Sequence, residues 1–267
     1  MMIAKWKLVL HHKGGAPDSI RKTNMNKPWM DITVLNLHIV TPAGKNPIYP
    51  VMLRDEDGIT LVDTGMIGQF AELQSALEHE GVQLSDIKRI IVTHSDIDHI
   101  GNLGALVNAI PEVEIWAHND EIPYITGKEP MIKFTPERKA LLPEPIAELA
   151  EQLISQRTEF KISKVLEDGD MLPLQGGIQV IHTPGHTPGH ICLYFREQQF
   201  LLAADELRVV DDELVGPAPP ATPDMPEALR SLKRLLGLKL EKVLCYHGGE
   251  YTDEPSRRIA ELAESAD

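Results

Sequence analysis

The sequence of 267 residues is poor in cysteine and has no long apolar run. Its two cysteines, Cys192 and Cys245, each lie in a short apolar stretch typical of a buried strand, so we expect no disulfide framework and a reducing compartment. No stretch approaches the roughly 18 apolar residues of a membrane span, and the first ten residues are too short and too charged for a signal peptide. We therefore expect a cytoplasmic protein without a membrane partner.

Positive charge is also scarce, with 26 Lys and Arg against 40 Asp and Glu and a formal net charge of -14. Proteins that bind nucleic acids gain affinity by placing Lys and Arg on phosphates, so a DNA or RNA partner is not expected. The hydrophobic share of 42% and the charged share of 25% are ordinary for a globular protein with a buried core. We expect a small-molecule partner, and a homodimer is left open.

Strand-like and helix-like segments follow one another in two halves. Beyond an initial strand at 5–10 and a loop at 13–28, apolar runs predict strands at 32–40, 49–53, 59–63, 89–93, 113–117, 178–182, 191–195, 200–203 and 242–246. Helical periodicity predicts helices near 70–77, 101–107, 146–155, 226–236 and from 254 onward. Two strand-rich halves with helices predict an α/β fold, an αββα sandwich of two mixed β-sheets forming one domain over 1–267.

Four candidate metal ligands lie within six residues, directly after the apolar run 89–93. They are His94, Asp96, Asp98 and His99. A single histidine is usually packed or solvated, but this density of His and Asp in a loop after a strand is typical of a metal site.

Three further candidate ligands also follow apolar strands. His186 lies in the Pro- and Gly-rich stretch 182–190. His247 comes directly after a predicted strand, and Asp205 comes one residue later than that after another. We expect structural roles for His182 and His190, and solvated or core positions for the histidines without a motif. Those are His11, His12, His38, His79 and His118.

This arrangement resembles the metallo-β-lactamase superfamily, whose marks are a His-x-His-x-Asp-His loop, a later Gly-His, an Asp and a last His. The resemblance covers most of the chain and implies two divalent metal ions, zinc being the first expectation. By position it assigns metal one to His94, Asp96 and His186, metal two to Asp98, His99 and His247, and both metals to Asp205. The run Asp63-Thr64-Gly65 resembles a family motif in which the Asp orients ligands from behind, the role implied for Asp63.

Asp96 departs from the family, which usually has His at this position. A carboxylate is a harder ligand than imidazole, so manganese or iron become alternatives to zinc at metal one. The other reading is that Asp96 turns away and metal one binds weakly. An acidic residue here also resembles the di-iron flavoprotein oxygen and nitric oxide reductases, so an oxidoreductase with a separate electron donor is an alternative, and a non-enzymatic metal-binding module is another.

The resemblance implies a hydrolase in which a metal-bridging hydroxide attacks an ester-like bond. Asp98 is expected to orient this nucleophile, and Asp205 to hold both metals, as the catalytic carboxylates. The charge disfavours nucleases and the missing signal peptide disfavours secreted β-lactamases, which leaves lactones and thioesters. Arg208 stands where quorum-signal lactonases have Tyr, so it is read either as a contact for an anionic substrate or as a surface residue.

The segment 119–163 is rich in proline and interrupts the strands. Long insertions between sheet elements are usually functional or flexible, so we expect a cap over the metal site. Tyr124 and Phe134 are the expected substrate contacts, and the anchoring residues are Leu149, Leu153 and Ile154. The alternative is a segment that packs on the surface or forms a dimer contact.

Overall fold

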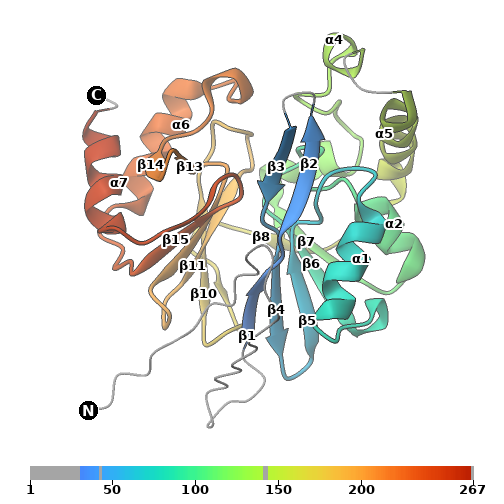
Figure 1. The fold of residues 1–267 in the computed structure, drawn as a ribbon, viewed down its shortest axis with the longest axis horizontal. Coiled ribbons are helices and arrows are strands. Elements are labelled where there is room, and N and C mark those ends of the chain that lie inside the picture. The colour runs from blue at the N-terminus through green and yellow to red at the C-terminus, as the bar shows by residue number, and fades with distance from the viewer. Residues whose placement is uncertain (1–30, 42–43, 141–143, 266–267) are drawn as a thin grey trace.

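The computed structural model describes residues 31–41, 44–140 and 144–265, and in this part of the chain two sheets pack face to face with helices on both outer sides (Figure 1). The predicted α/β sandwich is confirmed. The expected strand at 5–10 and loop at 13–28 lie outside the described residues.

The first sheet joins antiparallel strands at one side to parallel strands at the other. Its strands in spatial order are β1 (Asp31–Val34), β4 (Val51–Asp55), β5 (Gly58–Val62), β6 (Ile87–Val92), β7 (Glu114–His118) and β8 (Ile162–Leu166). The helices that connect its parallel strands and cover its outer face are α1 (Phe70–His79), α2 (Leu103–Ala109) and α5 (Glu144–Gln156). Because β5 to β8 are parallel, their carboxyl ends lie at one edge.

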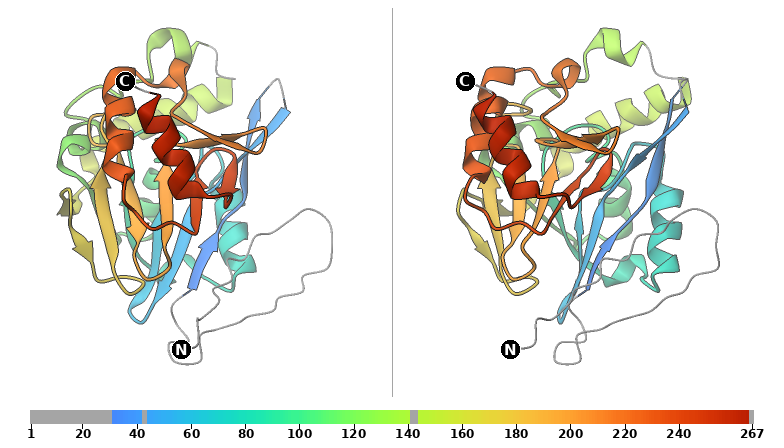
Figure 2. Two further views of the ribbon diagram at one scale, coloured as in Figure 1. Left: turned by 90° about the vertical axis from the view of Figure 1, so that its left-hand side faces the viewer. Right: turned by 60° about the vertical axis from the view of Figure 1, so that its left-hand side comes forward.

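The second sheet is antiparallel except for one parallel pair, β12 with β15. Its strands in spatial order are β16 (Gly249–Tyr251), β15 (Lys242–Cys245), β12 (Phe200–Ala204), β11 (Ile191–Phe195), β10 (Ile178–His182) and β9 (Met171–Leu172). Figure 2 shows α6 (Met225–Ser231) and α7 (Pro255–Glu264) together over its outer face.

Two hairpins and several short helices complete the described fold. The hairpins pair β2 (Leu37–Thr41) with β3 (Gly44–Ile48) and β13 (Arg208–Val210) with β14 (Glu213–Val215). The short helices are η1 (Leu84–Asp86), η2 (Asn119–Glu121), α3 (Ile122–Ile125), α4 (Pro136–Lys139), η3 (Arg157–Glu159), η4 (Pro219–Ala221) and η5 (Leu232–Leu235). The single strand expected at 32–40 was wrong, since Leu35 and Asn36 separate β1 from β2.

Three apolar layers hold the sandwich together. In β11 the side chains alternate, so that Ile191 and Leu193 face the layer between the sheets while Cys192 and Tyr194 face the layer under α6 and α7. Strands buried on both faces must be apolar at every position, which explains the continuous runs in the sequence. Cys192 and Cys245 are buried, free thiols.

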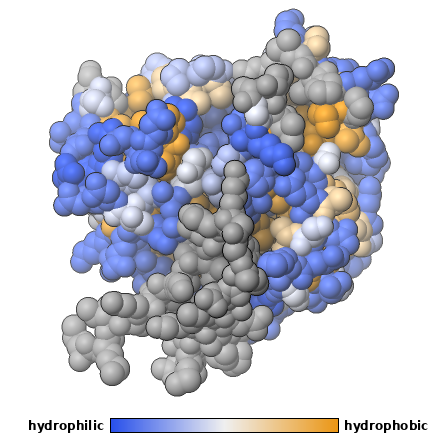
Figure 3. Space-filling view, viewed as in Figure 1, coloured by the Kyte–Doolittle hydropathy of each residue, from blue (hydrophilic) through white to orange (hydrophobic). Residues whose placement is uncertain are grey.

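The outer surface is mainly polar. On the face seen in Figure 3, hydrophilic residues cover most of the described surface and apolar residues form smaller patches. Within the described ranges, we find no helix with the length and apolar character required to traverse a bilayer.

Candidate metal centre

Strand ends from both sheets carry the seven predicted ligands to one place between the layers. The loop after β6 in the first sheet supplies four of them. The other three follow β10, β12 and β15 of the second sheet, and are His186, Asp205 and His247. The sandwich therefore builds this centre by bringing the edges of its two sheets together.

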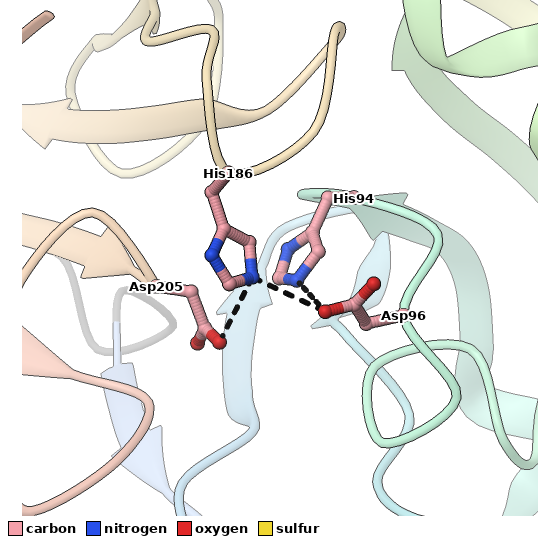
Figure 4. A group of neighbouring side chains, drawn as sticks. All are labelled: His94, Asp96, His186 and Asp205. Atoms are coloured by element: carbon pink, nitrogen blue, oxygen red, sulfur yellow. Dashed lines mark hydrogen bonds and ion pairs between the residues drawn. The ribbon is translucent and has the colours of Figure 1, made fainter. Parts of the chain in front are cut away.

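Two imidazoles and two carboxylates form the first ligand group, shown in Figure 4. One ligand atom from each of His94, Asp96, His186 and Asp205 lies within 4.8 Å of the others. Asp96 Oδ2 lies 3.4 Å from His94 Nε2 and 3.1 Å from His186 Nε2. Asp96 thus turns toward the centre with the two histidines.

Asp98, His99 and His247 form the second ligand group, again with ligand atoms within 4.8 Å of one another. Asp205 reaches both groups, because its Oδ2 lies 3.2 Å from His186 Nε2 while its Oδ1 lies 3.3 Å from His99 Nε2. The same Oδ2 lies 3.5 Å from His247 Nε2. This is the geometry of a carboxylate shared between two metal positions.

Hydrogen bonds from behind orient three of the imidazole rings. In each ring Nδ1 contacts an oxygen, which leaves Nε2 directed at the centre, as is usual for histidine ligands. The pairs are His94 with Thr93 Oγ1 at 3.1 Å, His99 with Asp63 Oδ2 at 2.8 Å, and His186 with Thr222 Oγ1 at 3.2 Å.

Asp63 lies behind the His99 ring. Its carboxylate accepts hydrogen bonds from the Thr93 amide at 2.9 Å and the Thr93 hydroxyl at 2.7 Å, in addition to its contact with His99. Its backbone is left-handed, with φ of 61°, as is that of Ala204 with φ of 45°, directly before Asp205. Such strained conformations persist where surrounding contacts fix them, often beside functional groups.

The donor set fits two divalent ions. His94 Nε2, His99 Nε2 and Asp205 Oδ1 are buried atoms without a hydrogen-bond partner in the described part of the chain, and all three point into the centre. Buried polar atoms rarely remain unsatisfied without a bound group. Four imidazole nitrogens and three carboxylates are competent ligands for zinc, manganese or iron.

The candidate histidine ligands differ in protonation. Burial lowers the pKa of all four, but at His99, His186 and His247 the neighbouring carboxylates outweigh burial and raise the pKa. Burial, followed by the charge of His99, lowers the pKa of His94 to about 4, so its ring is neutral near pH 7. Burial raises the pKa of Asp205, but His247 and His99 outweigh it and hold this pKa well below the ordinary value. The shared carboxylate is therefore anionic.

A cavity of about 260 Å³ opens beside the centre. Its polar lining comes from Ser95, Asp96, Asp98, Lys133, Asp205 and His247, and its apolar lining from Ile97, Met131, Ile132, Phe134 and Ala221. Of the expected substrate contacts, Phe134 lines this cavity, whereas Tyr124 and Arg208 do not belong to its described lining. Arg208 Nε instead donates to the Gly216 carbonyl at 3.2 Å.

The segment 119–163 divides into two parts. The stretch from Met131 to Phe134 lines the cavity beside the candidate ligands. Helix α5 instead covers the first sheet, with Leu153 buried and Ile154 partly buried in the outer apolar layer. Leu149 is 38% exposed and is not part of this apolar layer.

Glu121 is a buried site residue that the sequence reasoning missed. Its Oε1 accepts from the Ser95 amide at 2.7 Å and the Ser95 hydroxyl at 2.5 Å. Its Oε2 accepts from the Thr187 hydroxyl and the Gly189 amide, both at 2.8 Å. Glu121 thus ties the loop of His94 to the loop of His186. The sequence feature that could have located Glu121 is its position just after β7, the strand that lies beside β6.

Tyr246 and His190 support the centre from outside, whereas His182 does not contact it. Tyr246 donates its hydroxyl to the Asp98 carbonyl at 2.5 Å, and its ring lies 3.8 Å from the His99 ring. His190 Nε2 accepts from the Asp205 amide at 3.1 Å. His182 stacks on His118 at 3.9 Å, away from the seven ligands.

Comparison with known proteins agrees with this geometry. The family model described as "Metallo-beta-lactamase superfamily" matches residues 43–247. "Probable metallo-hydrolase YflN" of Bacillus subtilis is 28% identical over 90% of this chain and 98% of its own length. An N-acyl homoserine lactonase of Bacillus thuringiensis is 27% identical over 80% of this chain and 85% of its own length.

Solved structures share the fold. A metallo-beta-lactamase family protein from Thermus thermophilus superposes with a TM-score of 0.62 at 25% identity, covering 88% of this chain and 78% of that one. A B3 metallo-beta-lactamase described as having an active site glutamic acid superposes with a TM-score of 0.58 at 18% identity, covering 90% and 87%.

Proposed function

The chain belongs to the metallo-β-lactamase superfamily, and from this premise we propose that it is a dinuclear metallo-hydrolase that cleaves an ester-like bond, a lactone or thioester, in a small molecule. The observation that carries the proposal is the pair of ligand groups joined by Asp205 beside a partly apolar cavity. Zinc is the first candidate metal, with manganese or iron as alternatives because Asp96 is a hard ligand.

Two divalent ions, when bound, lower the pKa of a water molecule between them and polarise a carbonyl oxygen of the substrate. The residues of the chain supply position and proton transfer. Asp98 lines the cavity, and its backbone is held by Tyr246, so its carboxylate is placed to accept a proton from the attacking water and pass it to the leaving group. His247 Nε2, 3.2 Å from Asp98 Oδ2, fixes that carboxylate.

The cavity lining supports an acyl substrate. Met131, Ile132 and Phe134 form an apolar wall of the cavity that the carboxylates also line, and ligand sites typically combine such walls with a few polar groups. Similarity to an N-acyl homoserine lactonase supports a lactone substrate. Arg208 stands in place of the lactonase Tyr, which supports a thioester substrate as the alternative.

Metal removal is expected to abolish hydrolysis. Dialysis against a chelator should leave a folded, inactive protein, and about two equivalents of zinc, manganese or iron should restore turnover of lactone, thioester or ester substrates. Elemental analysis, circular dichroism and a substrate panel measure these outcomes. Hydrolysis that survives complete metal removal would refute the proposal, as would a reconstituted protein that reduces oxygen or nitric oxide and hydrolyses nothing in the panel.

Replacing Phe134 by Ala is expected to raise KM for substrates with an apolar acyl chain by about tenfold, because part of the apolar wall is lost. Metal content should not change, since Phe134 contacts substrate space rather than the ligands. Tyr124→Ala is the matched control, because this aromatic residue of the same segment lies outside the cavity lining that the structure describes. Equal KM changes in both variants would show that the wall does not select the substrate.

A further inference from the structure

Lys133 extends from the segment 119–163 into the first ligand group. Its Nζ lies 2.5 Å from Asp96 Oδ2 and 2.5 Å from His186 Nε2. The lysine side chain is only 9% exposed and that of Asp96 13%. The ammonium group therefore contacts two of the atoms that would bind a metal in this group.

The two ligand groups differ in this respect. Lys133 Nζ contacts Asp96 and His186, which both belong to the first group. Asp98 Oδ2 instead lies 3.2 Å from His247 Nε2, a member of its own second group. The positive charge of Lys133 thus acts mainly on the first group.

We propose that Lys133 competes with the metal ion of the first ligand group, so that the chain binds its two ions in sequence, tightly at Asp98, His99 and His247 and weakly at His94, Asp96 and His186. This inference rests on the dinuclear centre of the proposed function. Two cations that share one carboxylate oxygen at such distances repel each other strongly, even at the effective dielectric constant of a protein site.

The ammonium is able to leave because of its flexible four-carbon stem. Lys133 also lines the cavity, between Ile132 and Phe134, so an ion entering the first group drives the ammonium toward the substrate space. Filling of the first group is therefore linked to the position of the segment that shapes the cavity. A salt bridge that merely stabilised the fold would have no such link to metal affinity.

Titration of metal-free protein with Zn²⁺ and with Mn²⁺ tests the proposal, by calorimetry and by competition with a chromophoric chelator. The wild type is expected to bind two ions in separate steps. Lys133→Met, which keeps most of the length but not the charge, should tighten the weaker step by roughly tenfold or more and leave the tighter step unchanged. Lys133→Arg should retain the gap, and Lys128→Met, an exposed lysine of the same segment, should match the wild type.

Each other outcome has a definite meaning. Equal tightening of both steps in Lys133→Met, or no change in either, overturns the competition while leaving a dinuclear hydrolase intact. Failure of the wild type and all variants to bind any metal overturns the proposed function as well. Thermal melting of each metal-free variant checks folding, and Lys133→Gln gives a second uncharged variant whose affinities must agree with those of Lys133→Met.

Discussion

Replacing Asp205 by Ala is expected to remove both metal ions and abolish hydrolysis while the sandwich remains folded. Asp205 is the one ligand whose two oxygens reach both groups, at 3.2 Å from His186 and 3.3 Å from His99. Metal ions supply several kcal/mol of transition-state stabilisation, and each 1.4 kcal/mol is tenfold in rate, so the loss should be about 10³-fold or more. Elemental analysis and turnover of the best substrate measure it.

His99→Ala provides the comparison within the centre. His99 belongs to the second group alone, so this variant should lose the second ion first while the first group keeps three protein ligands besides Asp205. Asp253→Ala, at an exposed carboxylate that belongs to neither ligand group, is the matched control and should retain full metal content and activity. Wild-type turnover in Asp205→Ala would exclude the shared carboxylate as the basis of the centre.

The convergence of the seven candidate ligands could be predicted from the sequence because each one belongs to a local pattern. His94, Asp98 and His99 lie in the loop that directly follows an apolar strand, and the end of a buried strand lies at the edge of its sheet. The same logic located Asp205 and His247. A local pattern therefore predicts where a residue lies along a strand, and the site is formed by the ends of these strands.

Contacts made across the fold left no such pattern. Lys133 reaches Asp96 over 37 positions of sequence, and the result depends on how the segment 119–163 folds back over the edge. Tyr124 and Phe134 are both aromatic residues of this segment, yet of the two only Phe134 belongs to the described lining of the cavity. Side-chain identity in an irregular segment does not tell which side chain turns inward.

Strand β3 was missed in the sequence analysis for a related reason. β3 contains Pro47, a residue type that is rare in central strands, and no strand is predicted there from the sequence. Its hairpin with β2 forms a separate two-stranded sheet in the described structure, where a proline is tolerated because it lies on an edge. The pairing partner, rather than the residues of β3, decides that structure.

Replacing Glu121 by Ala is expected to weaken both the fold and the metal centre. Glu121 is fully buried, and burial raises its pKa, whereas its hydrogen bonds with Ser95 and Thr187 oppose that shift. Loss of the carboxylate leaves the amides of Ser95 and Gly189 buried without an acceptor, at roughly 1–3 kcal/mol each. The free energy of unfolding should fall by about 3–5 kcal/mol.

Metal affinity should fall with it, because Glu121 joins the loop that carries His94 to the loop that carries His186. Residues that position ligands in this way typically change metal affinity by about 10- to 100-fold. The backbone of Gly189 packs directly on that of Glu121, since a Cβ on Gly189 would lie 2.3 Å from the Glu121 nitrogen. Chemical denaturation and metal titration report the two effects separately.

Glu121→Gln separates the positioning role from simple packing. Its amide oxygen still accepts from both Ser95 donors and the Thr187 hydroxyl can rotate to accept from the amide, but the Gly189 amide has no acceptor left. This variant should therefore fall between wild type and Glu121→Ala in both stability and metal affinity, while Glu148→Ala, an exposed glutamate on α5, should change neither. If Glu121→Ala loses stability but binds both metals as tightly as wild type in its folded range, the carboxylate stabilises the sandwich without aligning the two loops.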